Sequence, residues 1–208
     1  MIPAREALER LREGNLRFAE EDHSLHENSG SSRRNELTSG QTPFAIILGC
    51  SDSRVPAEIV FDQGLGDLFV IRVAGNIVAP SLVGSIEFAA TKFNTRLVVV
   101  LGHTQCGAIE ATLEELQQPM NVQSRNLRSI VDRIRPSVES LLVTDLRHNP
   151  AALVQQAVRA NIRVSVSQLR HGSEVLEQLI HKEGLQIVGA EYSLETGRVE
   201  FFDDLTDS

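Results

Sequence analysis

The sequence predicts an α/β fold with a mostly parallel central sheet of about five strands flanked by helices. Two apolar runs, at 44–49 and 97–101, carry no polar side chain, which is typical of parallel strands covered on both faces. Helical segments alternate with the predicted strands, and this alternation favours a parallel sheet. The 208 residues, 41% of them hydrophobic, suit one domain with a substantial core. We therefore expect a single domain over 1–208, made of an N-terminal helical arm (1–40) and an α/β core (41–208).

The arm begins with an amphipathic helix over 3–19, in which apolar residues form one stripe among charged ones. Gly14 and Asn15 are expected to weaken this helix in its middle. A polar loop over 20–35 follows, and a short helix is then expected to stop at Gly40.

The core is expected to alternate strands with helices. Strands are predicted at 44–49, 68–73, 97–101, 186–192 and 198–202, with the last two antiparallel. Helices are predicted at 57–61, 81–92, 108–118, 126–135, 151–169 and 174–182. Ser81 and Ser173 are the expected N-caps of two helices, and Pro136 is expected to end a third.

Composition excludes several classes of function. The net charge of -8 argues against a nucleic-acid partner and against a basic membrane-surface helix. No apolar run approaches the roughly 20 residues that span a bilayer, and the first residues show no signal-peptide core. We therefore expect a cytoplasmic protein with no membrane partner. In that compartment the two cysteines are expected to serve metal binding or catalysis rather than a disulfide.

Candidate metal ligands follow two of the predicted strands. Cys50 comes directly after the first apolar run, His103 ends the third strand region, and Cys106 follows two residues later. The carboxyl ends of parallel strands meet at one edge of a sheet, so these side chains are expected to lie together. Two thiolates and one imidazole suit zinc, and three protein ligands with one open position are the catalytic pattern. The alternative is that both cysteines are small core residues.

Asp52 and Arg54 lie two residues apart in the loop after Cys50, so their side chains can reach the same space. Asp52 could take the open position on the metal, or a charge-assisted pair with Arg54 could hold it off. In the second case Asp52 could accept a hydrogen bond from a zinc-bound water. The simpler interpretation is a surface ion pair of little energetic value.

Two motifs carry a resemblance to a known family. Residues 50–56 (CSDSRVP) and 102–107 (GHTQCG) closely resemble the motifs of the β-class carbonic anhydrases, and 40–43 and 68–76 extend the likeness. The resemblance implies zinc on Cys50, His103 and Cys106. It also implies that Asp52 and Arg54 orient a zinc-bound hydroxide, which attacks carbon dioxide to give bicarbonate and a proton.

The same resemblance implies further site residues and a partner chain. Gln41 matches a glutamine that donates a hydrogen bond to substrate, and Phe69 and Phe88 match positions lining a narrow apolar pocket, partly across a dimer interface. Gly107, next to Cys106, belongs to the matching motif and is counted with the substrate-binding residues. Family members are homodimers or dimers of dimers in which N-terminal helices wrap the partner, which gives the helix at 3–19 a role.

One departure from the family concerns regulation. A bicarbonate-regulated subtype uses a tryptophan, an arginine and a tyrosine in a non-catalytic pocket. Arg72 and Tyr192 match two of these positions, but Ile47 occupies the place of the tryptophan, and the chain contains no tryptophan. We therefore expect no complete bicarbonate pocket, and we expect Asp52 to be paired with Arg54.

Other functions stay open at this point. Carbon disulfide or carbonyl sulfide hydrolases resemble the same family and share its metal motif, and a zinc-bound scaffold without activity is a third hypothesis. A cysteine phosphatase is excluded, because its loop needs five residues between cysteine and arginine and this loop has three. His23 and His26 are the clustered histidines, and solvated surface residues describe them better than a proton shuttle.

Overall fold

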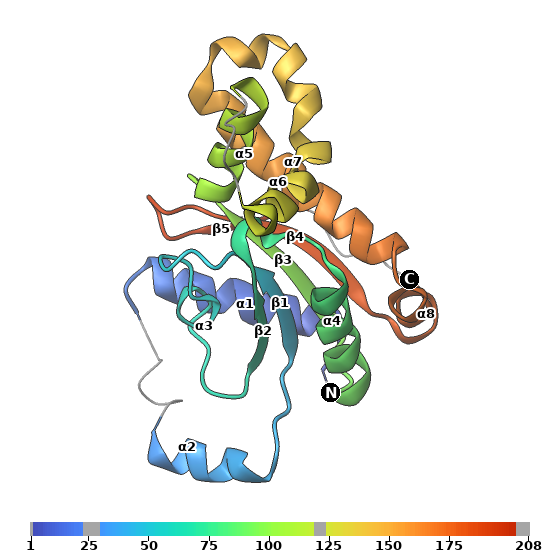
Figure 1. Cartoon of the computed structure of the whole chain (residues 1–208). Helices are drawn as coiled ribbons and strands as arrows, with labels where there is room; N and C mark the ends of the chain where they lie inside the picture. Colours follow the sequence, from blue (N-terminus) through green and yellow to red (C-terminus); the bar gives the residue numbers. More distant parts are fainter. Residues whose placement is uncertain (1, 23–29, 119–123, 203–208) are drawn as a thin grey trace.

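A five-stranded sheet forms the centre of the protein, as the computed structural model shows for residues 2–22, 30–118 and 124–202 (Figure 1). The strands lie in the order β2-β1-β3-β4-β5. Their bounds are β1 (Ala45–Gly49), β2 (Leu68–Arg72), β3 (Leu97–His103), β4 (Gln186–Tyr192) and β5 (Val199–Phe201). Neighbouring strands are parallel except for β4 and β5, which are antiparallel. The predicted fold class is confirmed.

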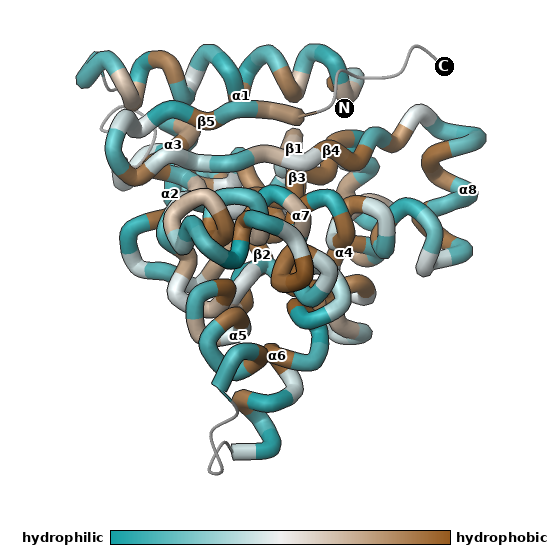
Figure 2. Tube along the Cα trace, turned by 90° about the horizontal axis from the view of Figure 1, so that it is seen from above, coloured by the Kyte–Doolittle hydropathy of each residue, from teal (hydrophilic) through white to brown (hydrophobic). Residues whose placement is uncertain are grey.

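Helices cover both faces of this sheet. They are α1 (Ala4–Ala19), α2 (Ser31–Glu36), α3 (Ala57–Val60), α4 (Pro80–Lys92), α5 (Gly107–Gln117), α6 (Arg125–Val138), α7 (Pro150–His171) and α8 (Glu174–Glu183), and the 3-10 turns are η1 (Leu37–Ser39), η2 (Ala74–Asn76), η3 (Glu139–Val143) and η4 (Asp145–His148). Figure 2 shows α1 on one side of the sheet, with α4, α5, α6 and α7 on the other. Alternate residues of β1 and β3 enter two separate hydrophobic clusters, because successive strand side chains point to opposite faces. Among the residues described, no helix is long and apolar enough to cross a membrane.

The helix α1 is unbroken, so the prediction that Gly14 and Asn15 weaken it is wrong. A Cβ atom at Gly14 would stand 1.9 Å from the backbone oxygen of Phe61, so glycine lets the helix lie directly on the chain beneath it. The buried Leu8 and Leu11 pack in the same cluster as strand residues of this chain. The apolar side of α1 is therefore used within its own chain, and packing of its outer side on a partner stays a prediction.

Asn15 is also a tertiary contact. Its side-chain amide donates to the carbonyls of Val60 (3.0 Å) and Gly197 (2.8 Å), and its oxygen accepts from the Val199 amide (2.7 Å). A polar side chain is stable in a buried position only when its polar atoms have such hydrogen-bond partners. Asn15 thus joins α1 to α3 and to the β4–β5 hairpin.

Gly14→Ala is expected to destabilise the protein by about 1–3 kcal/mol, because the added methyl group overlaps backbone that cannot move aside. Alanine is the better helix former by about 1 kcal/mol, so intrinsic propensity predicts the opposite sign. The matched control is Gly84→Ala in α4, where a Cβ meets nothing within 4 Å and stability should rise slightly. Urea unfolding followed by circular dichroism measures both. Stabilisation of Gly14→Ala would contradict the close approach.

Two predicted helix ends are wrong and one cap is confirmed. The helix α4 begins at Pro80 rather than after Ser81, because proline is pre-organised for the first helical position. The helix α6 continues past Pro136 to Val138, which is fully buried and keeps the last turn in the core. Ser173 caps α8 as predicted and accepts from the backbone amide three residues ahead.

Candidate metal centre

Three candidate ligands meet at the carboxyl edge of the sheet. The strands β1 and β3 are adjacent and parallel, with Gly49 paired to Leu101, so both end at the same edge. Cys50 follows β1, His103 is the last residue of β3, and Cys106 precedes the first turn of α5. All three side chains are buried. The structure thus brings together the residues that the sequence predicts as ligands.

The two sulfur atoms are spaced for a shared metal ion. The Sγ atoms of Cys50 and Cys106 are 4.0 Å apart, and all three ligand atoms lie within 4.8 Å of one another. Two sulfurs bound tetrahedrally to zinc at about 2.3 Å lie about 3.8 Å apart. A disulfide would need a separation of about 2.05 Å, so the cysteines are free thiols.

The imidazole of His103 presents one nitrogen for coordination. Its Nδ1 atom lies 2.9 Å from the Thr104 carbonyl, to which it donates as an N–H group. Its Nε2 atom is buried and has no hydrogen-bond partner among the described residues. A metal-binding histidine commonly has this arrangement, because the bond at one nitrogen fixes the tautomer and leaves the lone pair of the other free. The donor set therefore fits a zinc ion.

Asp52 and Arg54 form a two-pronged ion pair beside the ligands. Arg54 donates from Nε to Oδ1 (2.9 Å) and from Nη2 to Oδ2 (2.8 Å), and its backbone amide donates to Oδ1 (3.0 Å). The Oδ2 atom lies 3.8 Å from Nε2 of His103. Asp52 is thus held at the rim of the ligand cluster, in the paired arrangement expected for this site.

Two arginines fix the loops that carry the ligands. Arg72 donates to the carbonyls of Cys50 (2.9 Å) and Asp52 (2.5 Å), and Arg54 also donates to the carbonyl of Gln105 (3.3 Å). Gln105 has a φ of 54°, which is uncommon for a residue other than glycine. The Arg54 contact therefore supports a strained turn between His103 and Cys106.

Comparisons with known proteins agree with this geometry. The structure is similar to the crystal structure of a β-carbonic anhydrase of Aspergillus fumigatus, with a TM-score of 0.74 and 25% identity over 96% of this chain and 90% of that one. A family model described as carbonic anhydrase matches residues 45–199. The chain belongs to the β-carbonic anhydrase family.

Relatives in two mycobacterial species support this membership. A carbonic anhydrase of Mycolicibacterium smegmatis is 42% identical over 199 residues, which cover 95% of this chain and 92% of that protein. Carbonic anhydrase 2 of Mycobacterium tuberculosis is 39% identical over 195 residues, covering 94% and 91%. This family member is accordingly an enzyme of the carbonic anhydrase type.

The ionisation of this β-carbonic anhydrase site follows from its hydrogen bonds. The hydrogen bond with Cys106 lowers the pKa of the Cys50 thiol below its usual value, and the same bond, together with burial, raises the pKa of Cys106. Burial lowers the pKa of His103, but the neighbouring Cys50 sulfur and the charge there outweigh this effect and raise the pKa. Hydrogen bonds from Arg54 hold the pKa of Asp52 well below its usual range. Asp52 is therefore an ionised acceptor at ordinary pH.

The predicted substrate-binding residues are not all near the ligands of their own chain. Gly107 adjoins Cys106 at the start of α5. Gln41 precedes β1 and so lies toward the amino-terminal ends of the strands, opposite the ligand cluster. Phe69 pairs with Ile46, four residues or about 13 Å of strand before Cys50. Its ring lies 6.3 Å from that of Phe88, which is 51% exposed on α4. The structure gathers the two phenylalanines with each other rather than with the ligand cluster.

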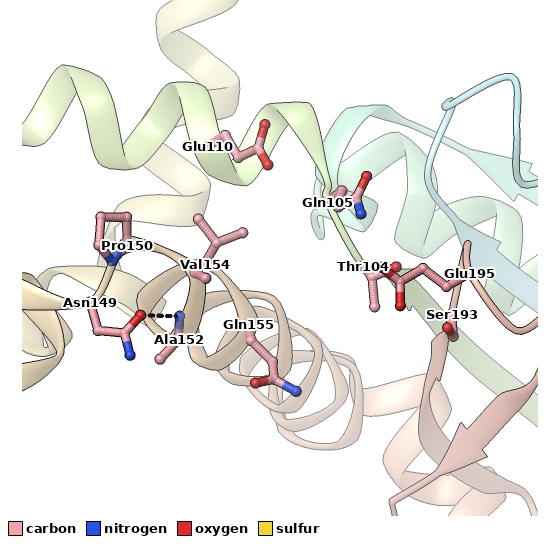
Figure 3. Close-up of a pocket in the computed structure, with 11 residues that line it drawn as sticks. Thr104, Gln105, Glu110, Asn149, Pro150, Ala152, Val154, Gln155, Ser193 and Glu195 are labelled. Atoms are coloured by element: carbon pink, nitrogen blue, oxygen red, sulfur yellow. Dashed lines mark hydrogen bonds between the residues drawn. The ribbon is translucent and has the colours of Figure 1, made fainter.

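A cavity of about 580 Å³ adjoins the ligand turn (Figure 3). Its walls are Thr104 and Gln105 of that turn, Glu110 of α5, the segment after β4 and the start of α7. None of the three ligands lines it. The cavity is therefore a neighbour of the metal centre and not the centre itself.

Sequence reasoning missed the residues that support the site from behind. The resemblance assigns Arg72 to a regulatory pocket, whereas in the structure its guanidinium donates hydrogen bonds to the loop that carries Cys50 and Asp52. Asn161 and Ser165 of α7 donate hydrogen bonds to the turn η2 next to Cys50. The signal available in the sequence was two polar residues on a helix face that is otherwise buried and apolar.

Two further sequence predictions concern other residues. Ile47, at the predicted place of the tryptophan, is fully buried in the hydrophobic cluster that includes α1. His23 and His26 lie outside the described residues.

Proposed function

We propose that this chain catalyses the reversible hydration of carbon dioxide to bicarbonate and a proton, using zinc held by Cys50, His103 and Cys106. One observation carries the proposal: two buried sulfurs and an unpartnered imidazole nitrogen form a cluster, and that nitrogen lies 3.8 Å from a carboxylate already paired with arginine. A purely structural zinc would use four protein ligands and would not need the Asp52–Arg54 pair.

Zinc bound here would supply the chemistry of water activation, by lowering the pKa of a coordinated water from about 15.7 to about 7. Asp52 accepts a hydrogen bond from the attacking water, and this bond orients a lone pair of the water oxygen toward the carbon of the substrate. Arg54 holds both oxygens of that carboxylate and keeps it ionised. Since the pair sits on the ligand loops themselves, orientation of the attacking group is set by the same segments that hold the metal.

A second copy of the chain completes the pocket in this proposal. Gln41 lies toward the far edge of the sheet from Cys50, and Phe88 presents an exposed aromatic ring. Both are therefore placed to reach a neighbouring protomer rather than their own centre. In this proposal the neighbouring protomer of a homodimer, or of a dimer of dimers, supplies the amide donor and an apolar wall of the pocket.

Stopped-flow measurement of carbon dioxide hydration, together with metal analysis of the purified full chain, tests the proposal. We expect about one zinc per chain and activity that is lost with a chelator and restored with zinc. Carbonyl sulfide and carbon disulfide should be assayed in parallel; the relatives named above are carbonic anhydrases, which favours carbon dioxide. A chain without zinc, or without hydration activity across alkaline pH, would refute the proposal.

A further inference from the structure

In one turn of the chain, a backbone amide donates a hydrogen bond to one of the candidate metal ligands. The turn is η2, in which Gly75 and Asn76 both have left-handed φ angles of 71° and 42°. The amide of Gly75 donates to the Sγ atom of Cys50 at 3.4 Å. Left-handed φ angles are uncommon outside glycine, and asparagine is among the residues that tolerate them best. Two such residues in succession leave the carbonyls of the turn without helical partners, and these carbonyls bond to side chains from another element.

Two side chains of α7 provide these bonds. Asn161 donates from its amide nitrogen to the Gly75 carbonyl (2.8 Å), and Ser165 donates from its hydroxyl to the Asn76 carbonyl (3.2 Å). The two residues are four apart and so share one helix face, and each is only 2% exposed. Buried polar side chains are costly unless bonded, and these two are bonded to consecutive carbonyls of the turn.

The same helix also lies directly against the strand that carries the second ligand. A Cβ atom at Gly102 would stand 2.5 Å from the Cδ1 atom of Ile162, so α7 packs on the residue immediately before His103. The position of α7 is therefore coupled to both β3 and η2. Asn161 is therefore carried by a helix whose position is fixed by packing, so it can hold the turn in place.

We propose that Asn161, assisted by Ser165, is a positioning residue that keeps the Gly75 N–H group on the Cys50 sulfur and thereby tunes the metal centre. The inference rests on the metal site of the proposed function. An N–H donor draws negative charge from a thiolate, so Cys50 gives less charge to the metal it binds. Two thiolates otherwise make that metal a weak Lewis acid, and the hydrogen bond opposes this effect.

Cobalt substitution of the full chain tests the inference by a spectroscopic signature. We compare the native sequence with Asn161→Ala and Ser165→Ala, and measure the sulfur-to-cobalt charge-transfer band and the rate of metal release to a chelator. Both variants should move the band to lower energy, Asn161→Ala by more, because the thiolate becomes the better donor. Metal release to the chelator should also become faster, because the turn next to Cys50 loses its anchor; this positional effect opposes the stronger donation by the thiolate.

Val166→Ala is the matched control. Val166 is buried on the same helix but packs toward Gly189 of β4, so its loss should lower the melting temperature and leave the band in place. An unmoved band in the Asn161 and Ser165 variants, or an equal shift in the control, would overturn the inference. Where Asn161→Ala yields no folded protein, Ser165→Ala decides. Failure of the native chain to bind cobalt would instead overturn the metal site, and this inference with it.

Discussion

Cys106→Ser is expected to abolish metal binding and turnover together. Serine keeps the shape of the side chain but its hydroxyl does not ionise, so the site loses one of three ligands and a formal charge. Zinc content should fall from about one per chain to near zero after dialysis. Metal analysis and carbon dioxide hydration, measured on the same sample, check this result.

Ala89→Ser is the matched control for that variant. Ala89 is fully buried in the same hydrophobic cluster as Cys106, so the change places a serine hydroxyl in the same core without touching a ligand. It should lower the stability and leave the zinc content unchanged. A Cys106→Ser protein that still carried its full zinc complement would show that Cys106 is a core residue and not a ligand.

Asp52→Asn is expected to keep the metal and to lose most of the turnover. The amide is nearly the same size, but it is neutral, and one of its two terminal atoms is a donor facing the Arg54 guanidinium. The acceptor that aims the attacking water is lost, and kcat should fall by about 100-fold or more. Stopped-flow kinetics with parallel zinc analysis measure the two properties separately.

Asp67→Asn is the corresponding control. Asp67 is similarly shielded and forms ion pairs with Arg10 and Arg33, but it belongs to the turn before β2. Its loss should affect the stability of that turn and leave kcat unchanged. Full activity of Asp52→Asn would mean that the carboxylate next to His103 is a structural ion pair only.

The clustering of Cys50, His103 and Cys106 could be predicted because its signals are local. Cys50 and His103 follow short apolar runs that favour strands, and the carboxyl ends of parallel strands meet. The support from α7 could not be predicted in this way. Asn161 and Gly75 are 86 residues apart, and nothing in the sequence around either one shows that they touch. Gly14 is the clearest failure: helix propensity suggests a weak point, whereas the tertiary structure makes it a point of closest contact.

The position of β4 in the sheet determines when the centre can be completed during synthesis. The turn after His103 is tied down by β4: the Thr104 amide donates to the Tyr192 carbonyl, and the Leu194 amide donates to the Thr104 hydroxyl. These partners lie about 90 residues further along the chain. A ribosome that has made β1, β3 and α5 has therefore already delivered all three candidate ligands, yet the second flank of β3 stays unpaired until about the last ninth of the polypeptide, where β4 lies. In the proposed function, the turn that carries His103 and Cys106 is thus held in its final position only once β4 has been made.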